Sequence, residues 1–390
     1  MKQSPLLFFP IAEYKTRLKK VIIGMEKSGL DAIVLTSDEN TFYFSGFRSI
    51  VWDSKVSTPG TLVITLDGSM ALSTSMSGSH TARATSCVED IRGYGLDGYP
   101  TYIKAITSLL EEKGCMAGRI GFEFGAGHKM HLNYNMTQEL FTALRDAQRV
   151  DAGPILWDVR SVKSPLEIEK LRKTCDINIK AIQKGFDSVK AGMTEMEMYG
   201  IIMSDYYIQG AERALSIGLR AGKERYSQSN CPPSYRPISE GDIILVDGGP
   251  VYHGYYSDII REGLIGKPTD LQLEIFTVAR EACYKGIDRM KPGIPINEIS
   301  GAVDRSIDGS RFSDIHTNRN WCGHSIGVGV HEYPMLDSGT DDILLSGMVF
   351  AIEPYLFQEG VGSLGIEENV LITETGYEIL TPSKSDLIII

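Results

Sequence analysis

The chain has 390 residues, of which 42% are hydrophobic and 23% are charged, and its formal net charge is −11. This length exceeds the ~250–300 residues at which a single hydrophobic core stops growing, so two domains are expected. The acidic balance excludes nucleic-acid backbone binding as the main task, because that task needs a basic face.

The sequence also predicts the compartment of the protein. No apolar run reaches the length of a membrane span, and the apolar patch within residues 1–10 is too short for the core of a signal peptide. The six cysteines are scattered without the spacing of a metal or redox motif, which is typical of reduced, mostly buried thiols. We therefore expect a cytoplasmic protein with neither a membrane nor a nucleic acid as its partner.

The first part of the chain alternates between helix and strand patterns. Apolar residues recur at helical spacing over residues 13–29, and Gly29 is a plausible C-cap. Short apolar runs at residues 32–36, 61–66 and 119–123 predict buried strands, and residues 102–112 and 129–145 predict helices. Such alternation indicates an α/β domain, which we assign to residues 1–155.

One surface feature of this domain stands out. Residues 47–53 (FRSIVWD) place Arg48 and Trp52 in an expected loop. A tryptophan in a loop is more often a packing anchor than a ligand contact. Both residues are nevertheless kept as candidate substrate contacts, for a reason given below.

The second domain is expected over residues 156–390. Ser164 and Glu167 form a capping box with Pro165 at the first helical position, so a long helix should begin there. Thr194 and Glu197 form a second capping box, which should open a helix running to residue 207.

This second domain contains an internal repeat. Lys190, Gly192 and Glu197 share their spacing with a later trio, Lys291, Gly293 and Glu298. Gly241 precedes Asp247 by the same interval that separates Gly347 from Glu353. We therefore expect two αβ half-units related by a pseudo-twofold axis, with chemically important residues of both halves on one central sheet.

Two carboxylates mark the first half. A buried strand is predicted over residues 243–246, and Asp247 ends it just before Gly248-Gly249-Pro250. A second run, residues 251–256, leads to Asp258. Two carboxylates joined by a glycine-rich bend can converge on one point, and a buried carboxylate is costly unless it is paired, hydrogen-bonded or bound to a metal. A turn-capping Asp beside a surface Asp is the plainer alternative.

The downstream sequence favours a metal site. His324 lies in a glycine-rich segment, Glu353 ends an apolar run, and Glu367 precedes another. Together with the two aspartates these residues offer four carboxylates and one imidazole, which suit divalent Mn, Co, Fe or Zn. Four negative ligands balance two divalent cations, so a dinuclear site is expected, with Mn or Co as the first choice.

These residues also carry a family resemblance. The order Asp, Asp, His, Glu, Glu, within VDGG, YSD, GHSIG, HEYP, IEP and IEEN, resembles the pita-bread metallopeptidases, in their creatinase, prolidase and aminopeptidase P branch. The resemblance implies an α+β pita-bread catalytic domain that follows a creatinase-like N-terminal domain. It also implies a homodimer in which the N-terminal domain of one subunit lines the other's active site, hence the interest in Arg48 and Trp52.

The expected chemistry is hydrolysis of a small peptide bond by a metal-bridging hydroxide. Glu353 is expected to act as general base as well as ligand, because a carboxylate beside the attacking water can shuttle its proton. His331 stands where the resembled family keeps a substrate-contacting imidazole. Its plainer alternative is a hydrogen-bonded strand histidine.

Three departures from the family pattern bear on the substrate. The window of residues 226–230 holds no histidine, Asn320 stands where a histidine is frequent, and Gly365 stands where an arginine is frequent. Tyr226, Asn230, Asn320 and Arg225 are candidate replacement contacts.

We therefore expect an Xaa-Pro dipeptidase or aminopeptidase. A small-molecule C–N hydrolase of the creatinase or ectoine-hydrolase type is the alternative. A non-catalytic binding module is a third reading, and it predicts eroded ligands, whereas all five are present here.

Overall fold

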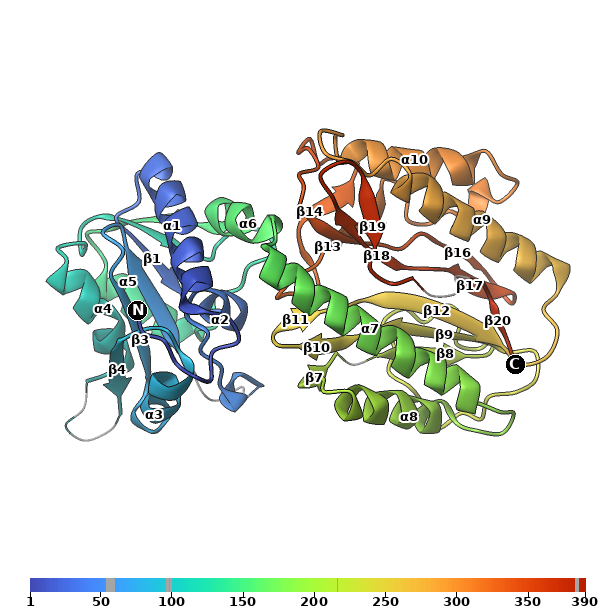
Figure 1. The fold of residues 1–390 in the computed structure, drawn as a ribbon, viewed down its shortest axis with the longest axis horizontal. Helices are drawn as coiled ribbons and strands as arrows, with labels where there is room; N and C mark the ends of the chain where they lie inside the picture. Colours follow the sequence, from blue (N-terminus) through green and yellow to red (C-terminus); the bar gives the residue numbers. More distant parts are fainter. Residues whose placement is uncertain (54–59, 96–97, 99, 216, 383–385) are drawn as a thin grey trace. The chain divides into compact units, whose positions relative to one another are not determined.

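A computed structural model describes residues 1–53, 60–95, 98, 100–215, 217–382 and 386–390. Contacts between residues divide the chain into two compact units, Met1–Arg160 and Ser161–Ile390 (Figure 1). Among the described residues, no helix combines the length and apolar character needed to cross a bilayer.

The N-terminal unit is built on a six-stranded mixed sheet with the strand order β4-β3-β2-β1-β5-β6. Strand β1 pairs antiparallel with β2 and parallel with β5. The strands are β1 (Ala32–Leu35), β2 (Thr61–Thr65), β3 (Met70–Ser75), β4 (Asp90–Tyr94), β5 (Arg119–Phe122) and β6 (Gln148–Asp151). The helices are α1 (Ile11–Ser28), α2 (Asp38–Ser45), η1 (Ile50–Asp53), α3 (Met76–Thr85), α4 (Tyr102–Glu112), α5 (Tyr134–Ala143) and α6 (Gly153–Ser161).

Most elements predicted for this unit are present. Helix α1 ends at Gly29, which adopts the left-handed conformation with a φ of 63° that a C-cap glycine tolerates without strain. Helix α4 matches its predicted range. Helix α5 is shorter than the pattern indicated, because the Asn133 side chain caps its N-terminus and so starts the helix later.

The C-terminal unit has two helix pairs with strands between them (Figure 1). One half consists of α7 (Pro165–Ser188), α8 (Glu195–Ile208) and a four-stranded sheet of order β20-β12-β9-β8. The other half consists of α9 (Asp270–Ile287), α10 (Asn297–Asp308) and a five-stranded sheet of order β14-β13-β15-β18-β19. Each helix pair packs its apolar face into a separate hydrophobic cluster.

The strands of this unit are listed by their bounds. They are β7 (Arg213–Ala214), β8 (Gly218–Ala221), β9 (Ile243–Gly248), β10 (Pro250–Tyr252), β11 (Tyr255–Tyr256), β12 (Ile259–Leu264), β13 (Trp321–Ser325), β14 (Glu332–Asp337), β15 (Val349–Ile352), β16 (Tyr355–Gln358), β17 (Gly362–Gly365), β18 (Glu368–Ile372), β19 (Tyr377–Ile379) and β20 (Ile388–Ile389). A short 3-10 helix, η2 (Ser313–Ile315), precedes β13.

Local capping chemistry starts both helices of the first half. In α7 the Ser164 hydroxyl accepts from the Glu167 N–H, while the Glu167 carboxylate accepts from the Ser164 N–H. Thr194 and Glu197 make the same reciprocal pair at the start of α8. Both predicted capping boxes are confirmed.

The internal repeat is visible in matched backbone geometry. Gly192 and Gly293 both have positive φ, 91° and 86°, and they donate their N–H groups to the carbonyls of Ile238, before β9, and Leu344, before β15. Gly241 and Gly347, with φ values of 86° and 93°, form a second matched pair. The repeat predicted from glycine spacing is therefore present, and it relates β9 and β12 to β15 and β18.

Two details differ from the sequence expectation. The two halves contribute separate sheets rather than one, and the Glu367 N–H joins them by donating to the Ile260 carbonyl at 3.3 Å. Residues 251–256 are not one strand, because His253, with a φ of 49°, and Gly254 make a tight turn that separates β10 from β11.

Candidate metal centre and its cavity

The Gly-Gly bend after Asp247 permits a close approach of backbone segments. A Cβ atom at Gly249 would lie 1.9 Å from the Ser257 carbonyl oxygen, so no larger residue fits there. The chain then returns as β12, which pairs antiparallel with β9 and sets Asp247 opposite Ile260. Asp258 stands just before β12, and the bend thereby brings it beside Asp247.

The second half supplies the other ligand candidates. His324 on β13 pairs with Ala351 on β15, and Glu353 follows β15 with its N–H donating to the Cys322 carbonyl at 2.8 Å. Glu367 immediately precedes β18, where its N–H joins the two sheets. Every one of these positions is at the end of a strand or at an irregular register, where a side chain can turn toward a shared point.

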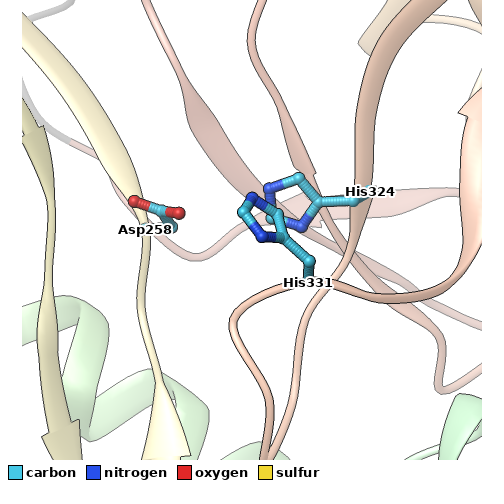
Figure 2. A group of neighbouring side chains, drawn as sticks. All are labelled: Asp258, His324 and His331. Atoms are coloured by element: carbon cyan, nitrogen blue, oxygen red, sulfur yellow. The ribbon is translucent and has the colours of Figure 1, made fainter. Parts of the chain in front are cut away.

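The side chains meet in three overlapping groups. The groups are Asp247 with Asp258 and Glu367, His324 with Glu353 and Glu367, and Asp258 with His324 and His331. Within each group the potential ligand atoms lie within 4.8 Å of one another. Figure 2 shows the Asp258 carboxylate facing the two imidazole rings, whose centroids are 4.3 Å apart in an edge-to-face arrangement.

The electrostatics of the cluster favour a cation. Burial raises the pKa of Asp247 to about 7, and the Glu353 charge adds to the effect. Burial and the neighbouring Asp247 raise the pKa of Asp258 well above its ordinary value, and burial and Asp258 do the same for Glu367. Buried like charges repel, so a bound divalent ion would relieve the strain that these groups share.

The hydrogen bonds also fit a metal site. The Nδ1 atom of His324 lies 3.0 Å from the Ser325 carbonyl oxygen, so Nε2 is the ring nitrogen that faces the carboxylates and could serve as a metal ligand. Nε2 lies 3.2 Å from Oε1 of Glu353. Among the described residues, Oδ1 of Asp258 and both carboxylate oxygens of Glu367 are buried without a hydrogen-bond partner. Acceptor atoms of this kind suit a divalent cation.

A buried asparagine holds the backbone of Asp258 in place. The Asn369 amide donates from Nδ2 to the Asp258 carbonyl at 2.6 Å and accepts from the Asp258 N–H at 3.2 Å. It also accepts from the Ser257 hydroxyl at 3.0 Å. Asn369 lies on β18, so these hydrogen bonds connect a candidate ligand of the first half to the sheet of the second.

Replacing Asn369 with Ala is expected to weaken metal binding about 10–100-fold, because outer groups that orient a ligand contribute that much to affinity. Unfolding should cost about 1–3 kcal/mol less, since the Asp258 backbone loses two buried hydrogen bonds. Metal titration and urea unfolding measure the two effects. The control is Asn297→Ala, which removes an amide donating to Asp341 at 3.3 Å in a more exposed setting. Equal metal affinity for both variants would contradict the role of Asn369.

A cavity of about 720 Å³ opens onto the cluster. It is bounded by β8, β9 and the loop of residues 229–232 on one side, and by residues near β13 and β14 on the other. Asp247, Asp258, Glu353 and His331 all line it. The carboxylates therefore face a space large enough for a small peptide.

The predicted substrate contacts are divided between cavity and core. Asn230 lines the cavity. Tyr226 and Asn320 are not among its described lining residues: Tyr226 packs in the hydrophobic core and accepts from the Ile243 N–H, and the Asn320 N–H donates to Asp304. Arg48 and Trp52 lie in the N-terminal unit, where Arg48 lies over the Phe42 ring and Trp52 packs against Phe47. The substrate roles of all these residues stay predictions.

The lining residues that sequence reasoning did not single out include Arg220, Asn318, Trp321 and Tyr355. Only Arg220 carried a usable signal, a charge inside an otherwise apolar strand pattern. Gly365, the position at which the resembled family frequently has an arginine, cannot hold a side chain in this backbone. A Cβ there would lie 2.4 Å from the Pro354 carbonyl oxygen.

Comparison with known proteins decides the family. Residues 169–374, more than half of the chain, match the model of metallopeptidase family M24. The chain belongs to metallopeptidase family M24. Residues 17–162 match the creatinase/prolidase N-terminal domain, so the predicted fold class, with a creatinase-like α/β domain before a pita-bread domain, is confirmed.

Relatives of this M24 chain cover it almost completely. An Xaa-Pro dipeptidase from Pyrococcus horikoshii is 26% identical over 374 residues, which are 95% of this chain and 98% of the relative. A prolidase structure from the same organism is 25% identical, with a TM-score of 0.81 over 96% of this chain and 100% of that one. An Xaa-Pro dipeptidase structure from Bacillus anthracis has the same fold, with a TM-score of 0.85 at 24% identity over 97% of this chain and 100% of that one.

Proposed function

We propose that this M24 chain is a metal-dependent Xaa-Pro peptidase that hydrolyses the bond before proline in a small peptide. The observation that carries the proposal is the convergence of four carboxylates and two imidazoles at a cavity of peptide size. The printed names of its relatives, Xaa-Pro dipeptidase and prolidase, agree with it.

Two divalent ions are proposed to be held by Asp247, Asp258, His324, Glu353 and Glu367, with Mn or Co preferred and Fe or Zn compatible. Four carboxylates balance the charge of two such ions, and the single imidazole suits a borderline metal. When bound, the ions would lower the pKa of a water molecule and polarise the substrate carbonyl.

The remaining chemistry falls to the side chains around the ions. Glu353 lies at the cavity surface and 3.2 Å from His324, and its carboxylate would take a proton from the attacking water and pass it to the leaving nitrogen. His331 lines the same cavity beside His324. Burial lowers the pKa of His331, which favours the neutral ring, and the neutral ring would donate one hydrogen bond to the substrate carbonyl.

The decisive experiment is turnover of the Mn-loaded protein on a panel of Xaa-Pro dipeptides, matched Xaa-Ala dipeptides, longer peptides and creatine-like compounds. We expect Xaa-Pro cleavage at rates ordinary for enzymes, about 10 per second. Cleavage of the creatine-like compounds alone would establish the small-molecule C–N hydrolase instead. No turnover on any member of the panel, with two ions bound, would favour a binding module.

His331→Ala is expected to lower kcat about 10²–10³-fold, the usual cost of one lost transition-state hydrogen bond. Metal content should stay at the native value, because all five proposed ligands remain. Since His331 also falls in a ligand group with Asp258 and His324, elemental analysis separates the two roles. A variant that loses metal would make His331 a ligand and contradict its assignment as a substrate contact.

Two further expectations accompany this proposal. The protein is proposed to work in the cytoplasm as a homodimer, with Arg48 and Trp52 of the partner near the cavity. Sedimentation of the purified protein tests the dimer directly.

A further inference from the structure

Arg220 occupies a position that puts a positive charge beside the metal-binding carboxylates. It lies on β8, where Leu219 and Ala221 point into the hydrophobic core while Gly218 and Arg220 line the cavity. Gly218 pairs with Asp247. Arg220 is thus two residues along from the Asp247 row on the same face of the sheet, about 7 Å away along the strand.

The guanidinium group has few partners of its own. Arg220 is 7% exposed, yet its one hydrogen bond to a described residue is a long one, from Nη2 to the Ser363 hydroxyl at 3.4 Å. Its Nε atom is buried without a hydrogen-bond partner among the described residues. An arginine has five N–H donors, so most of this side chain's hydrogen-bonding capacity is unused.

Arg261 shows what a structural arginine looks like in the same unit. It is similarly buried at 4% exposure, but it donates to the Glu367 carbonyl at 2.7 Å and to the Glu368 carboxylate at 2.9 Å. It also donates to the Thr381 carbonyl at 3.2 Å. The N–H donors of Arg261 are therefore used within the fold. Arg220 instead lines the cavity, and most of its N–H donors have no hydrogen-bond partner among the described residues.

The acidic residues described near Arg220 do not form an ion pair with its side chain. Its charge opposes the effect of burial on the pKa of both Asp247 and Glu262. No described carboxylate lies within ion-pair distance of Arg220, and the Glu262 carboxylate instead accepts from the Gly365 N–H at 3.3 Å. Once Asp247 binds metal, its negative charge is shared with the ion, and a buried cation without a paired anion is costly.

We propose that Arg220 binds the free C-terminal carboxylate of a dipeptide substrate. The proposal rests on the proposed peptidase function. One residue spans about 3.5 Å. A carboxylate one residue beyond the scissile bond therefore stays within reach of Arg220, which is two residues along β8 from the partner of Asp247. The planar guanidinium matches a carboxylate in a two-pronged pair, which gives selectivity as well as affinity. In longer or amidated peptides no anion would stand there, so the enzyme would act on dipeptides.

The first test needs no turnover. Binding of L-proline and of L-prolinamide to the Mn-loaded full chain is measured by calorimetry. The native protein is expected to bind proline about 10–100-fold more tightly, the worth of a hydrogen-bonded charge pair. Arg220→Gln should bind both probes equally, Arg220→Lys should keep part of the preference, and Lys223→Gln, an exposed charge removed three residues away, should match the native protein.

Two results would overturn the proposal. One is a native protein that binds the two probes equally or binds neither. The other is an Arg220→Gln variant that keeps its preference for proline at native metal content, since the ions alone would then hold the carboxylate. If Arg220→Gln does not fold, the native preference and the Arg220→Lys variant decide.

The second test is kinetic and separates this inference from the proposed function. On an Xaa-Pro dipeptide and its amide, the native enzyme is expected to favour the dipeptide by about 10-fold or more in kcat/KM, mainly through KM, and Arg220→Gln to lose that preference. If no peptide is cleaved, the proposed function fails while the proline measurement still decides the role of Arg220. Equal cleavage of dipeptide and amide by the native enzyme would overturn the role itself.

Discussion

Removing divalent metal is expected to lower peptide hydrolysis by at least about 10³-fold, because the ions supply several kcal/mol of transition-state stabilisation that no side chain in the cavity replaces. Adding Mn or Co should restore the rate, with two ions bound per chain. The physical basis is the cluster of Asp247, Asp258 and Glu367, whose carboxyl pKa values are all raised by burial and by repulsion from neighbouring carboxylates.

The measurement combines exhaustive chelation, elemental analysis and stepwise addition of Mn. Bound metal should also stabilise the fold by about 2.7 kcal/mol at a free concentration 100 times the Kd, so the thermal midpoint should rise with Mn. Addition of Mg at the same concentration is the control for ionic effects. Full turnover with no detectable metal would refute the whole assignment of the site.

Asp258→Asn is expected to have opposite effects on stability in the presence and absence of metal. With metal, the variant should bind less than two ions per chain and lose about 10²–10³-fold in rate, because one anionic ligand is gone. Without metal, it should be more stable than the native protein. Asp258 is 7% exposed, and removal of its charge relieves repulsion from Asp247.

The stability part of this prediction is read from thermal unfolding of both proteins, metal-free and Mn-loaded, at pH 7. A gain of about 1 kcal/mol corresponds to about 2–4 °C in a domain of this size. The matched control, Asp314→Asn, removes a charge from an exposed position and should change neither quantity. If the variant were more stable than the native protein in both metal states, or less stable in both, Asp258 would not be a ligand.

Much of the fold could be predicted from short stretches of sequence. The capping boxes at Ser164 and Thr194 depend on residues three positions apart, and they start helices where expected. Gly192, Gly293, Gly241 and Gly347 mark positive φ values, so their spacing reports the internal repeat before any contact between the halves is known. These signals are reliable because the energy of a cap or a left-handed turn is decided within a few residues.

The candidate cluster of carboxylates and imidazoles was predictable for a different reason. Buried carboxylates and histidines need compensation wherever they lie, so the residue types themselves indicated a shared ion. The family resemblance then named the order in which they occur. The convergence of Asp247, Asp258 and Glu367 in one group agrees with that interpretation, although the residues come from separate strands.

Only the tertiary structure decided which side chains face the cavity. Tyr226 and Asn320, which were predicted as substrate contacts, are not among the described residues that line the cavity, and their substrate roles stay predictions. Arg220 gave a weak signal in sequence, and its open donors become evident only beside Asp247 and β17. The physical reason is the distance along the sequence over which the interactions act. Caps and turns are decided within a few residues. The lining of a cavity depends instead on pairings such as that of Glu367 with Ile260, more than a hundred residues apart. Separations of that length leave no periodic trace in the sequence.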